Sequence, residues 1–211
     1  MKILITLGAT REPIDAVRFI GNRSSGKMGA ALGHAAKSRK HQITLIAGSI
    51  TVPLPNLESP DRRLDVQTAE QMYEAVVREF HGHDLLFMAA AVADYRPIRT
   101  EPGKLPRSGG LTIICEPTKD ILAAVSPAKR PDQRVVGFSL EQEGDIDRAR
   151  DKMIAKKVDL MVFNPLGTMN SENIDATLLW PNGRAESLGP RSKGEMGQTL
   201  LSRAEALFGH S

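Results

Sequence analysis

The stretch GNRSSGKMG, residues 21–29, has the spacing of a phosphate-binding P-loop but lacks one residue that the motif needs. The motif G-x-x-x-x-G-K is followed by Ser or Thr, whose hydroxyl helps to hold Mg²⁺, and this chain has Met28 there. A P-loop also joins a strand directly to a helix so that its amides surround the phosphate, whereas residues 8–25 separate the first apolar run from Gly26. The sequence therefore disfavours a P-loop nucleoside triphosphatase.

The start of the helix that is predicted from Gly26 could still bind an anion. Ser24, Ser25 and Gly26 stand where the free backbone amides and the dipole of a helix N-terminus favour negative charge. Gly29 and Gly33 on that helix allow its backbone to approach the sheet closely. A helix that is capped by Ser and packs tightly explains the same residues, and the local sequence does not choose between the two interpretations.

Three further stretches carry side chains that could do chemistry. The loop before the helix is unusually polar, with Thr10, Arg11, Glu12, Asp15, Arg18, Asn22 and Arg23. AAAVADYRP places small residues at a strand end, where they leave room for a ligand, ahead of Asp94. EPGKLPRSGG places Lys104 on a loop that could close over a site and neutralise charge in phosphoryl or nucleotidyl transfer. Each stretch also has an interpretation without chemistry: a solvated loop for the first, small residues that serve packing for the second, and a solvated lysine for the third.

Composition and charge limit the classes of function. The formal net charge is +3, no long basic run occurs and aromatic residues make up 4%, so we expect no nucleic-acid partner. Cys115 is the only cysteine, which excludes an intramolecular disulfide and a cysteine-based metal site, and its strand-like setting predicts a buried, inert thiol. The first apolar run is too short for a signal peptide or a membrane span, so we expect a cytoplasmic protein.

Strand and helix patterns alternate along the 211 residues. Apolar runs predict strands at 2–7, 42–47, 64–66, 84–93, 111–115, 134–138 and 158–163. Helical spacing predicts helices at 26–39, 68–80, 120–125 and 145–157, and a capping box at 192–195 predicts a last one. Residues 96–110, with three prolines and three glycines, predict a mobile loop. ATLLWPNGRAESL predicts a hairpin that turns on Asn182-Gly183.

This order predicts one α/β domain over residues 1–211: a Rossmann-like, doubly wound, mainly parallel sheet with helices on both faces and a small C-terminal β extension. Ligands bind such sheets beyond the carboxyl ends of the strands, so the loops after residues 7, 47, 93, 138 and 163 should share one edge. A dinucleotide-dependent reductase would suit the fold. The chain lacks G-x-G-x-x-G directly after the first strand, however, and has Ala47-Gly48 where an acidic residue usually closes the second.

Six stretches together resemble one known family. GATREPIDAVRFIGNRSSGKMG, AAAVADYR, EPGKL, KDIL, VVGF and ARDKMIAKKVDL are similar, in this order, to phosphopantothenoylcysteine synthetase. The similarity runs from residue 3 to about residue 205. This family is often fused behind a flavin-dependent decarboxylase, and that half is absent here. The resemblance therefore implies a stand-alone form or a separately expressed domain, without flavin.

The resemblance implies a two-step ligase reaction in coenzyme A biosynthesis. The carboxylate of 4′-phosphopantothenate attacks the α-phosphate of CTP and gives an acyl-cytidylate and pyrophosphate. Cysteine then displaces CMP and forms the amide. Mg²⁺ is expected with the triphosphate. The implied partners are a second copy of the chain, in a homodimer, and a separate phosphopantothenoylcysteine decarboxylase.

The resemblance also assigns site residues. Asn22 and Lys104 match the catalytic positions: the amide holds the acyl intermediate and the lysine supports cytidylate formation. Substrate binding is assigned to Asn22, Ala90, Ala91 and Arg18, the last reaching the phosphate across a dimer interface. Nucleotide binding is assigned to Ser24, Ser25, Gly26, Lys27, Met88, Ala89, Ala90, Asp94, Lys104, Lys119, Asp120, Ile121, Leu122, Phe138, Lys152 and Lys156. No metal ligand is assigned.

The chain departs from the family's pattern at four places. At 104–107 the chain has KLPR where the family has KIKK, and at 118–121 it has TKDI where the family has N/T-P-D-I. At 139–142 it has SLEQ in place of A-x-E-T, and Asn164-Pro165 replaces the family's Asn-Asp. These changes concern the nucleotide pocket. An ATP-using variant, and a paralogue that binds nucleotide without ligase activity, therefore stay open as alternatives.

Overall fold

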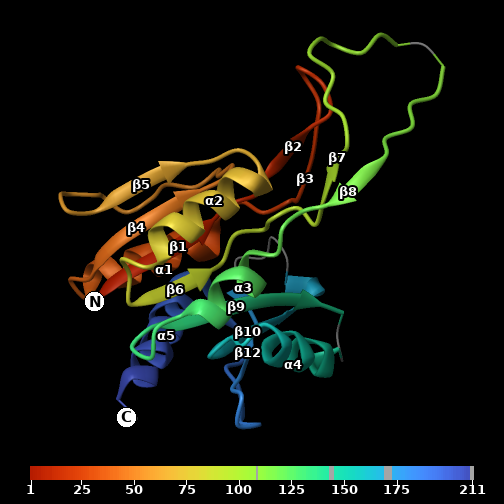
Figure 1. Ribbon diagram of the computed structural model, residues 1–211. Coiled ribbons are helices and arrows are strands. Elements are labelled where there is room, and N and C mark those ends of the chain that lie inside the picture. The colour runs from red at the N-terminus through yellow and green to blue at the C-terminus, as the bar shows by residue number, and fades with distance from the viewer. Residues whose placement is uncertain (108, 143–144, 169–172, 210–211) are drawn as a thin grey trace.

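The structure of the chain is a computed structural model that describes residues 1–107, 109–142, 145–168 and 173–209. Its main sheet has eight strands in the order β13-β12-β10-β9-β6-β1-β4-β5 (Figure 1). Their bounds are β1 Lys2–Leu7, β4 Gln42–Ala47, β5 Arg62–Asp65, β6 Leu85–Met88, β9 Arg134–Glu141, β10 Leu160–Pro165, β12 Thr177–Leu179 and β13 Ala185–Ser187. Six neighbouring strands of this sheet are parallel to one another: β10, β9, β6, β1, β4 and β5. β12 and β13 are antiparallel to their neighbours.

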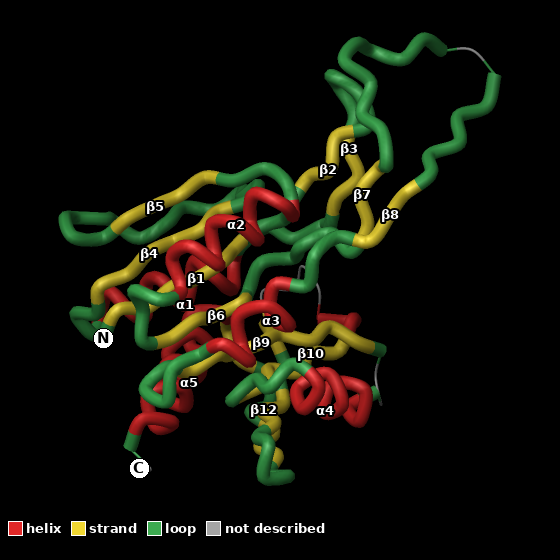
Figure 2. Tube along the Cα trace, in the orientation of Figure 1, coloured by secondary structure: helices red, strands yellow, loops and turns green. Residues whose placement is uncertain are grey.

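Helices cover both faces of this sheet (Figure 2). α1 (Lys27–Ser38) and α5 (Lys193–Glu205) pack on one face, and α2 (Ala69–Phe80), α3 (Ile121–Val125) and α4 (Ile146–Ala155) on the other. Short 3-10 turns follow at Ser126–Ala128, Leu166–Thr168 and Ala206–Phe208. β1 and β4 are nearly continuous Ile and Leu because a parallel strand between two helical layers is buried on both sides. The predicted α/β, doubly wound fold is confirmed.

Several features that were predicted from local sequence are confirmed by the structure. β1 and β4 have the predicted bounds, and both capping boxes are present, Thr68 with Gln71 and Ser192 with Glu195. The hairpin turns at the predicted position, where Gly183 adopts the left-handed conformation with φ 88°.

Three predicted segments are wrong in detail. The strand expected over 84–93 ends at Met88, because the small residues after it bend across the ends of the strands. The strand expected at 111–115 is instead β8 (Cys115–Pro117), which pairs with β7 (Tyr95–Pro97) inside the expected loop 96–110. Position 108 of that loop lies outside the described residues. Cys115 is half-buried rather than buried.

The predicted C-terminal β extension is present as an antiparallel hairpin at one edge of the main sheet. β12 joins the main sheet beside β10, so this hairpin forms one edge of the sheet, and β11 (Asn173–Ile174) pairs with β14 (Arg191–Ser192). No helix among the described residues is both long and apolar enough to cross a membrane.

Two ribbons project from the sheet as an arm, defined here by residues 11–21 and 95–117 without position 108 (Figure 1). β2 (Arg11–Pro13) pairs with β3 (Phe19–Gly21), and β7 pairs with β8. The loop between β7 and β8 returns to the β2–β3 turn, where Thr100 Oγ1 donates to the Pro13 carbonyl at 3.1 Å. The Glu101 amide donates to the Ile14 carbonyl at 3.0 Å.

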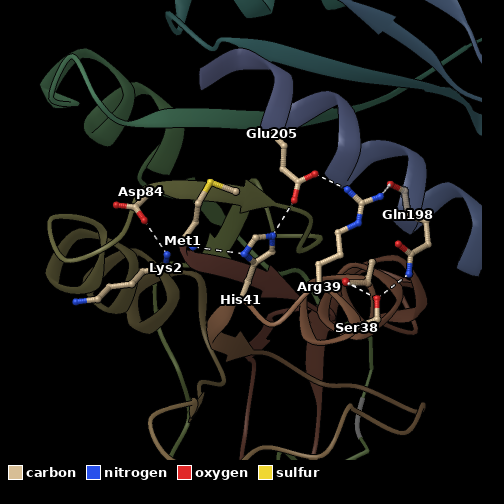
Figure 3. A network of polar contacts seen from close by, with 9 residues as sticks. Met1, Lys2, Ser38, Arg39, His41, Asp84, Gln198 and Glu205 are labelled. Carbon is tan, nitrogen blue, oxygen red and sulfur yellow. Dashed lines mark hydrogen bonds and ion pairs between the residues drawn. The ribbon is translucent and has the colours of Figure 1, made fainter. Parts of the chain in front are cut away.

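Polar side chains fasten α1 to α5 at their C-terminal ends (Figure 3). Glu205 accepts hydrogen bonds from the Arg39 guanidinium and, at 2.7 Å, from Nε2 of His41. Gln198 Nε2 donates to Ser38 Oγ at 3.1 Å. These bonds connect the last long helix to the first, so the two helices form one layer under the sheet.

Glycines set the spacing of α1. A Cβ on Gly29 would lie 2.3 Å from the Cβ of Leu7 in β1, so this glycine allows the predicted close approach of helix to sheet. Gly33 behaves differently, because the nearest atom to its added Cβ belongs to Pro55, at 3.2 Å.

We expect Gly29→Ala to lower the free energy of unfolding by about 1–3 kcal/mol, because α1 must move off Leu7. Gly194→Ala in α5 is the matched control, since nothing lies within 4 Å of its added Cβ. The control should keep or slightly raise stability, by up to about 1 kcal/mol of helix propensity. Denaturant unfolding measures both variants, and equal stability of Gly29→Ala and wild type would contradict the packing argument.

Candidate functional site

The carboxyl ends of β1, β4, β6, β9 and β10 lie at one edge of the sheet, as predicted, because these strands are parallel. Residues 89–94 cross this edge after β6. The Ala91 amide donates to the Gly8 carbonyl at 2.8 Å, and the Thr10 amide donates to the Ala91 carbonyl at 3.2 Å. The segments that follow β1 and β6 therefore lie side by side at the strand ends.

A cavity of about 310 Å³ opens at this edge, on the face that α3 and α4 cover. Ten of the residues assigned to nucleotide binding line it: Met88, Ala90, Asp94, Lys119, Asp120, Ile121, Leu122, Phe138, Lys152 and Lys156. The other lining residues are Val92, Ala93, Thr118, Ser139, Leu140 and Met161. The structure thus brings together residues from five separate stretches of the chain.

The cavity combines apolar walls with three cationic side chains. Met88, Leu122, Phe138 and Met161 form apolar surface, and Lys119, Lys152 and Lys156 supply positive charge. This combination can hold a molecule that has one flat, weakly polar part and one anionic part.

Each of the three lysines is held by a carboxylate. Lys119 Nζ lies 2.6 Å from Glu70 Oε1, and Lys156 Nζ lies 2.8 Å from Asp120 Oδ2. Lys152 donates to Glu141. The hydrogen bond from Lys119 to Glu70 raises the pKa of Lys119. The ammonium groups are therefore held in place before any ligand arrives.

The carboxyl groups that pair with Lys156 and Lys152 are ionised at neutral pH. Burial acts to raise the pKa of Asp120, but Lys156 and the Ala123 amide outweigh it and hold this pKa below its usual value. Burial likewise acts to raise the pKa of Glu141. Its bonds with Lys152 and Ser139 outweigh burial, so that pKa is also lowered.

Asn22 lies beside the cavity wall. Its Nδ2 donates to the Ala91 carbonyl at 3.2 Å and to the Val92 carbonyl at 3.1 Å, and Val92 lines the cavity. Nδ2 makes both of these bonds, so neither of them uses the amide oxygen Oδ1. Asn22 and Ala91, assigned to substrate binding, therefore lie together at the sheet edge, next to Ala90.

Ser24, Ser25, Gly26 and Lys27 reach the same edge from the opposite face of the sheet. Gly26 is the N-cap of α1, with φ 82° and no side-chain cap, so the interpretation as a Ser-capped helix is wrong. Ser24 Oγ instead accepts from the Gly26 amide at 3.3 Å. Gly26 packs against Gly8 at the end of β1, and Ala89 packs in the core on this same face. None of these residues lines the cavity.

Arg18 and Lys104 lie on the arm, away from the cavity. Arg18 Nη1 pairs with Asp15 Oδ2 at 2.8 Å, and the Leu105 amide donates to the same oxygen at 3.1 Å. Lys104 is the exposed neighbour of Leu105. Arg18 and Asn22 stand at opposite ends of β3, on the order of 13 Å apart along the strand. In one copy of the chain, Arg18 and the loop that carries Lys104 therefore lie at the far end of the β2–β3 ribbon from Asn22.

Two threonines hold the site in place, a role that the sequence pattern did not indicate, although Thr10 was noted among the polar side chains of the loop before α1. Thr6 Oγ1 accepts from the Ala90 amide at 3.1 Å, and Thr10 Oγ1 accepts from the Ala93 amide at 2.9 Å. Both threonines are fully buried, and they brace the segment that crosses the strand ends. The only signal was a hydroxyl within or just after an apolar strand, which many strands contain.

Among the described residues, no three His, Cys, Asp or Glu side chains gather as a metal site. Asp94 and Asp120 are the carboxylates on the cavity wall. One or two carboxylates fit Mg²⁺ that arrives with a triphosphate, since this ion keeps several waters and phosphate oxygens as ligands.

Comparison with known proteins gives a consistent match. The sequence profile of the family described as DNA/pantothenate metabolism flavoprotein C-terminal domain matches residues 1–207. The coenzyme A biosynthesis bifunctional protein CoaBC of Vibrio vulnificus (strain YJ016) is 38% identical over 216 residues, which cover 99% of this chain and 53% of that protein. The chain therefore spans about half the length of the curated relatives it matches.

Two solved structures extend the comparison. The crystal structure of the C-terminal domain of a CoaBC protein has 30% identity and a TM-score of 0.84, covering 100% of this chain and 96% of that one. A Cab2 mutant in complex with phosphopantothenate-cysteine has 18% identity and a TM-score of 0.80, covering 99% of this chain and 86% of that one. At 18% identity, the second likeness concerns the fold alone.

Asp15 fastens the loop that carries Lys104, and its loss should loosen that loop. Oδ1 accepts from the amides of Val17 and Arg18 while Oδ2 accepts from the Leu105 amide, so the single carbonyl oxygen of Asp15→Asn cannot serve both groups. We expect faster hydrogen exchange of the Leu105 amide in this variant at neutral pH. Asp65→Asn, an exposed aspartate on β5, is the control and should leave that exchange rate unchanged.

The pH dependence of the same contact has a defined sign. Burial acts to raise the pKa of Asp15, but three backbone amides and the Arg18 guanidinium outweigh it and lower this pKa. Because the pKa is lowered, the contact stabilises the fold at pH values above the pKa of Asp in the unfolded chain, about 3.9. This stabilisation is lost as the pH falls through the pKa of Asp15 in the folded chain. The amide chemical shift of Leu105 should therefore titrate below about pH 3.9, and a midpoint above it would contradict this assignment.

Proposed function

The chain belongs to the DNA/pantothenate metabolism flavoprotein C-terminal domain family, and from this membership we propose that it is a ligase of coenzyme A biosynthesis that joins 4′-phosphopantothenate to L-cysteine. The observation that carries the proposal is the convergence of ten residues assigned to nucleotide binding on one cavity, with Asn22 bonded to its wall. A cavity with apolar walls and three lysines suits a nucleoside triphosphate.

The proposed reaction has two steps. A carboxylate oxygen of 4′-phosphopantothenate attacks the α-phosphorus of the triphosphate, and pyrophosphate leaves. The amine of cysteine then attacks the acyl carbon, loses a proton, and the nucleoside monophosphate leaves. The activation step is needed because a free carboxylate is a poor acylating agent, whereas a nucleotide is a good leaving group.

Different residues of the cavity bind the two ends of the nucleotide. The apolar wall around Phe138 and Met88 takes the base of the nucleotide, and Lys119, Lys152 and Lys156 bind the anionic part of the nucleotide. Asn22, held through Nδ2 by two backbone carbonyls, offers Oδ1 to the acyl intermediate or to the incoming amine. The preferred triphosphate in this proposal is CTP, with ATP as the alternative. Mg²⁺ with Asp94 as a neighbour would neutralise part of the triphosphate charge.

We propose that the chain acts as a homodimer held through the arm. Among the described residues, six of the eleven exposed large apolar side chains lie there: Val17, Phe19, Tyr95, Ile98, Leu111 and Ile114. An apolar hollow of about 260 Å³ between the two ribbons could receive a side chain of a second copy. An arm that reaches across a dimer would bring Arg18 and Lys104 to the partner's cavity, which explains why one copy keeps them away from its own.

Three further points complete the proposal. Residues 1–211 act as one domain, since β12 lies in the same sheet as β1 and α5 packs on α1. The reaction takes place in the cytoplasm. A phosphopantothenoylcysteine decarboxylase, on the same or a separate chain, consumes the product.

Pyrophosphate release and product formation test the function directly. With CTP and Mg²⁺, pyrophosphate should appear only when 4′-phosphopantothenate is present, and the amide product only when cysteine is added. Asn22→Ala should lower kcat on the order of 100-fold or more, because the intermediate loses its hydrogen-bond partner. Asn56→Ala, an exposed asparagine bonded to Glu58, is the control and should keep wild-type activity. Binding of nucleotide without pyrophosphate release, under any combination of substrates, would identify the non-ligase paralogue instead.

Ile114→Glu should separate the dimer, because a charge would be buried in the proposed interface. Ile114 is 65% exposed in the single chain, and Ile154 on α4 is 63% exposed, so Ile154→Glu is a matched control outside the arm. Sedimentation analysis should show the dimer weakened on the order of 100-fold for the first variant and unchanged for the second.

Mixing two inactive chains tests whether Lys104 acts on the partner's site. If Lys104 crosses the interface, a heterodimer of Asn22→Ala and Lys104→Ala has one of its two sites with both residues intact. After equal mixing and subunit exchange about half of the dimers are heterodimers, so about a quarter of the wild-type rate should return. No recovery after subunit exchange would show that both residues serve the same chain's site.

A further inference from the structure

Glu141, the last residue of β9, is a carboxylate with unusually little contact with water. It is 7% exposed although it stands beside the opening of the cavity. Ser139 and Leu140, the two residues before it, line the cavity. A buried carboxylate persists where other groups neutralise it and donate hydrogen bonds to it.

The neighbours of Glu141 are arranged around its two oxygens. Oε1 accepts from Lys152 and, at 3.0 Å, from Ser139 Oγ. Oε2 lies 3.7 Å from Nε of Arg148. The oxygen that holds the lysine is therefore the one that Ser139 fixes. Ser139 stands in one of the stretches that depart from the family's pattern, SLEQ in place of A-x-E-T.

The three carboxylates that hold the cavity lysines differ in their exposure to solvent. The side chain of Asp120 is 45% exposed and that of Glu70 is 29% exposed, whereas that of Glu141 is 8% exposed. Water screens the first two pairs more strongly than the third. Glu141 is thus the most buried of the three carboxylates.

Glu141 could affect an anionic ligand in two opposite ways. Its negative charge repels the ligand, which would make its removal favourable to binding. It also fixes a lysine whose side chain is 40% exposed and would otherwise sample many rotamers in water. An ammonium group has three donors, so Lys152 can keep its bond to Glu141 and still donate two to a phosphate. The bond to the carboxylate is then compatible with the bound state.

We propose that Glu141 is a positioning residue for the triphosphate site, which aims Lys152 into the cavity and is itself fixed by Ser139. The inference rests on the proposed function, because it takes the ligand of the cavity to be a nucleoside triphosphate. It adds a residue that contacts no ligand and acts through Lys152.

A double-mutant cycle on the full chain tests the proposal, with dissociation constants for CTP and for ATP from calorimetry. Glu141→Ala should weaken binding on the order of tenfold, since a charge-assisted hydrogen bond to the lysine is lost. Glu141→Ala added to Lys152→Ala should change nothing further. Glu141→Gln keeps an acceptor oxygen and should lose about threefold or less.

Glu79→Ala is the matched control for loss of a buried, paired glutamate. Glu79 is 9% exposed and pairs with Arg62 at 2.9 and 3.2 Å, next to β5 at the end of the sheet. This variant should lose stability but keep the wild-type dissociation constants. Ser139→Ala supplies a second variant if Glu141→Ala does not fold, and it should weaken binding by a few-fold in the wild type and not in Lys152→Ala.

Additive effects of Glu141→Ala and Lys152→Ala would overturn the proposal, and so would tighter binding in both Glu141→Ala and Glu141→Gln, which would show that repulsion dominates. A chain that binds the triphosphate with the expected coupling but releases no pyrophosphate would refute the ligase and leave this inference standing. A wild-type chain that binds neither CTP nor ATP would overturn both.

Discussion

The site depends on the parallel register of five strands that end at one edge of the sheet. β1, β4, β6, β9 and β10 run side by side, so the loops that follow them meet although they are far apart in the chain. Buried Ile and Leu hold the strands between two helical layers, and the missing side chain of Gly29 lets α1 pack against Leu7. The segment 89–94 then crosses the strand ends, braced by the hydroxyls of Thr6 and Thr10.

Charge in the cavity is organised before a ligand binds. Each of the three lysines has a carboxylate partner. Lysine partners and nearby hydrogen bonds lower the pKa of Asp120 and of Glu141, so these two carboxylates stay ionised. Such pairs reduce the net attraction for an anion. In return they fix the positions of the ammonium groups, so that fewer rotamers are lost when phosphate binds.

The arm separates two parts of the proposed chemistry. Asn22 lies at the base of the β2–β3 ribbon against the cavity wall, whereas Arg18 and Lys104 gather around Asp15 at the far end. An exposed apolar surface accompanies that separation. Both features have one explanation if a second copy covers the arm, because the same contact that buries the apolar side chains would deliver the cations to the neighbouring cavity.

The order of elements, the parallel sheet and both capping boxes could be predicted from the sequence, because apolar periodicity and helix caps are set by neighbouring residues. The residues themselves indicated the part of the cavity lining that ends at Asp94, and the rest of the lining was indicated only through resemblance to a family. Tertiary structure alone decided that Glu141 holds Lys152, that Asp15 fixes Leu105 and that two threonines brace the strand ends. These pairs are 11, 90 and more than 80 residues apart, and such contacts exist only once crossovers have set the strand order. For the same reason the β12–β13 hairpin was found at the edge of the main sheet only in the structure, because its position depends on the free edge of β10.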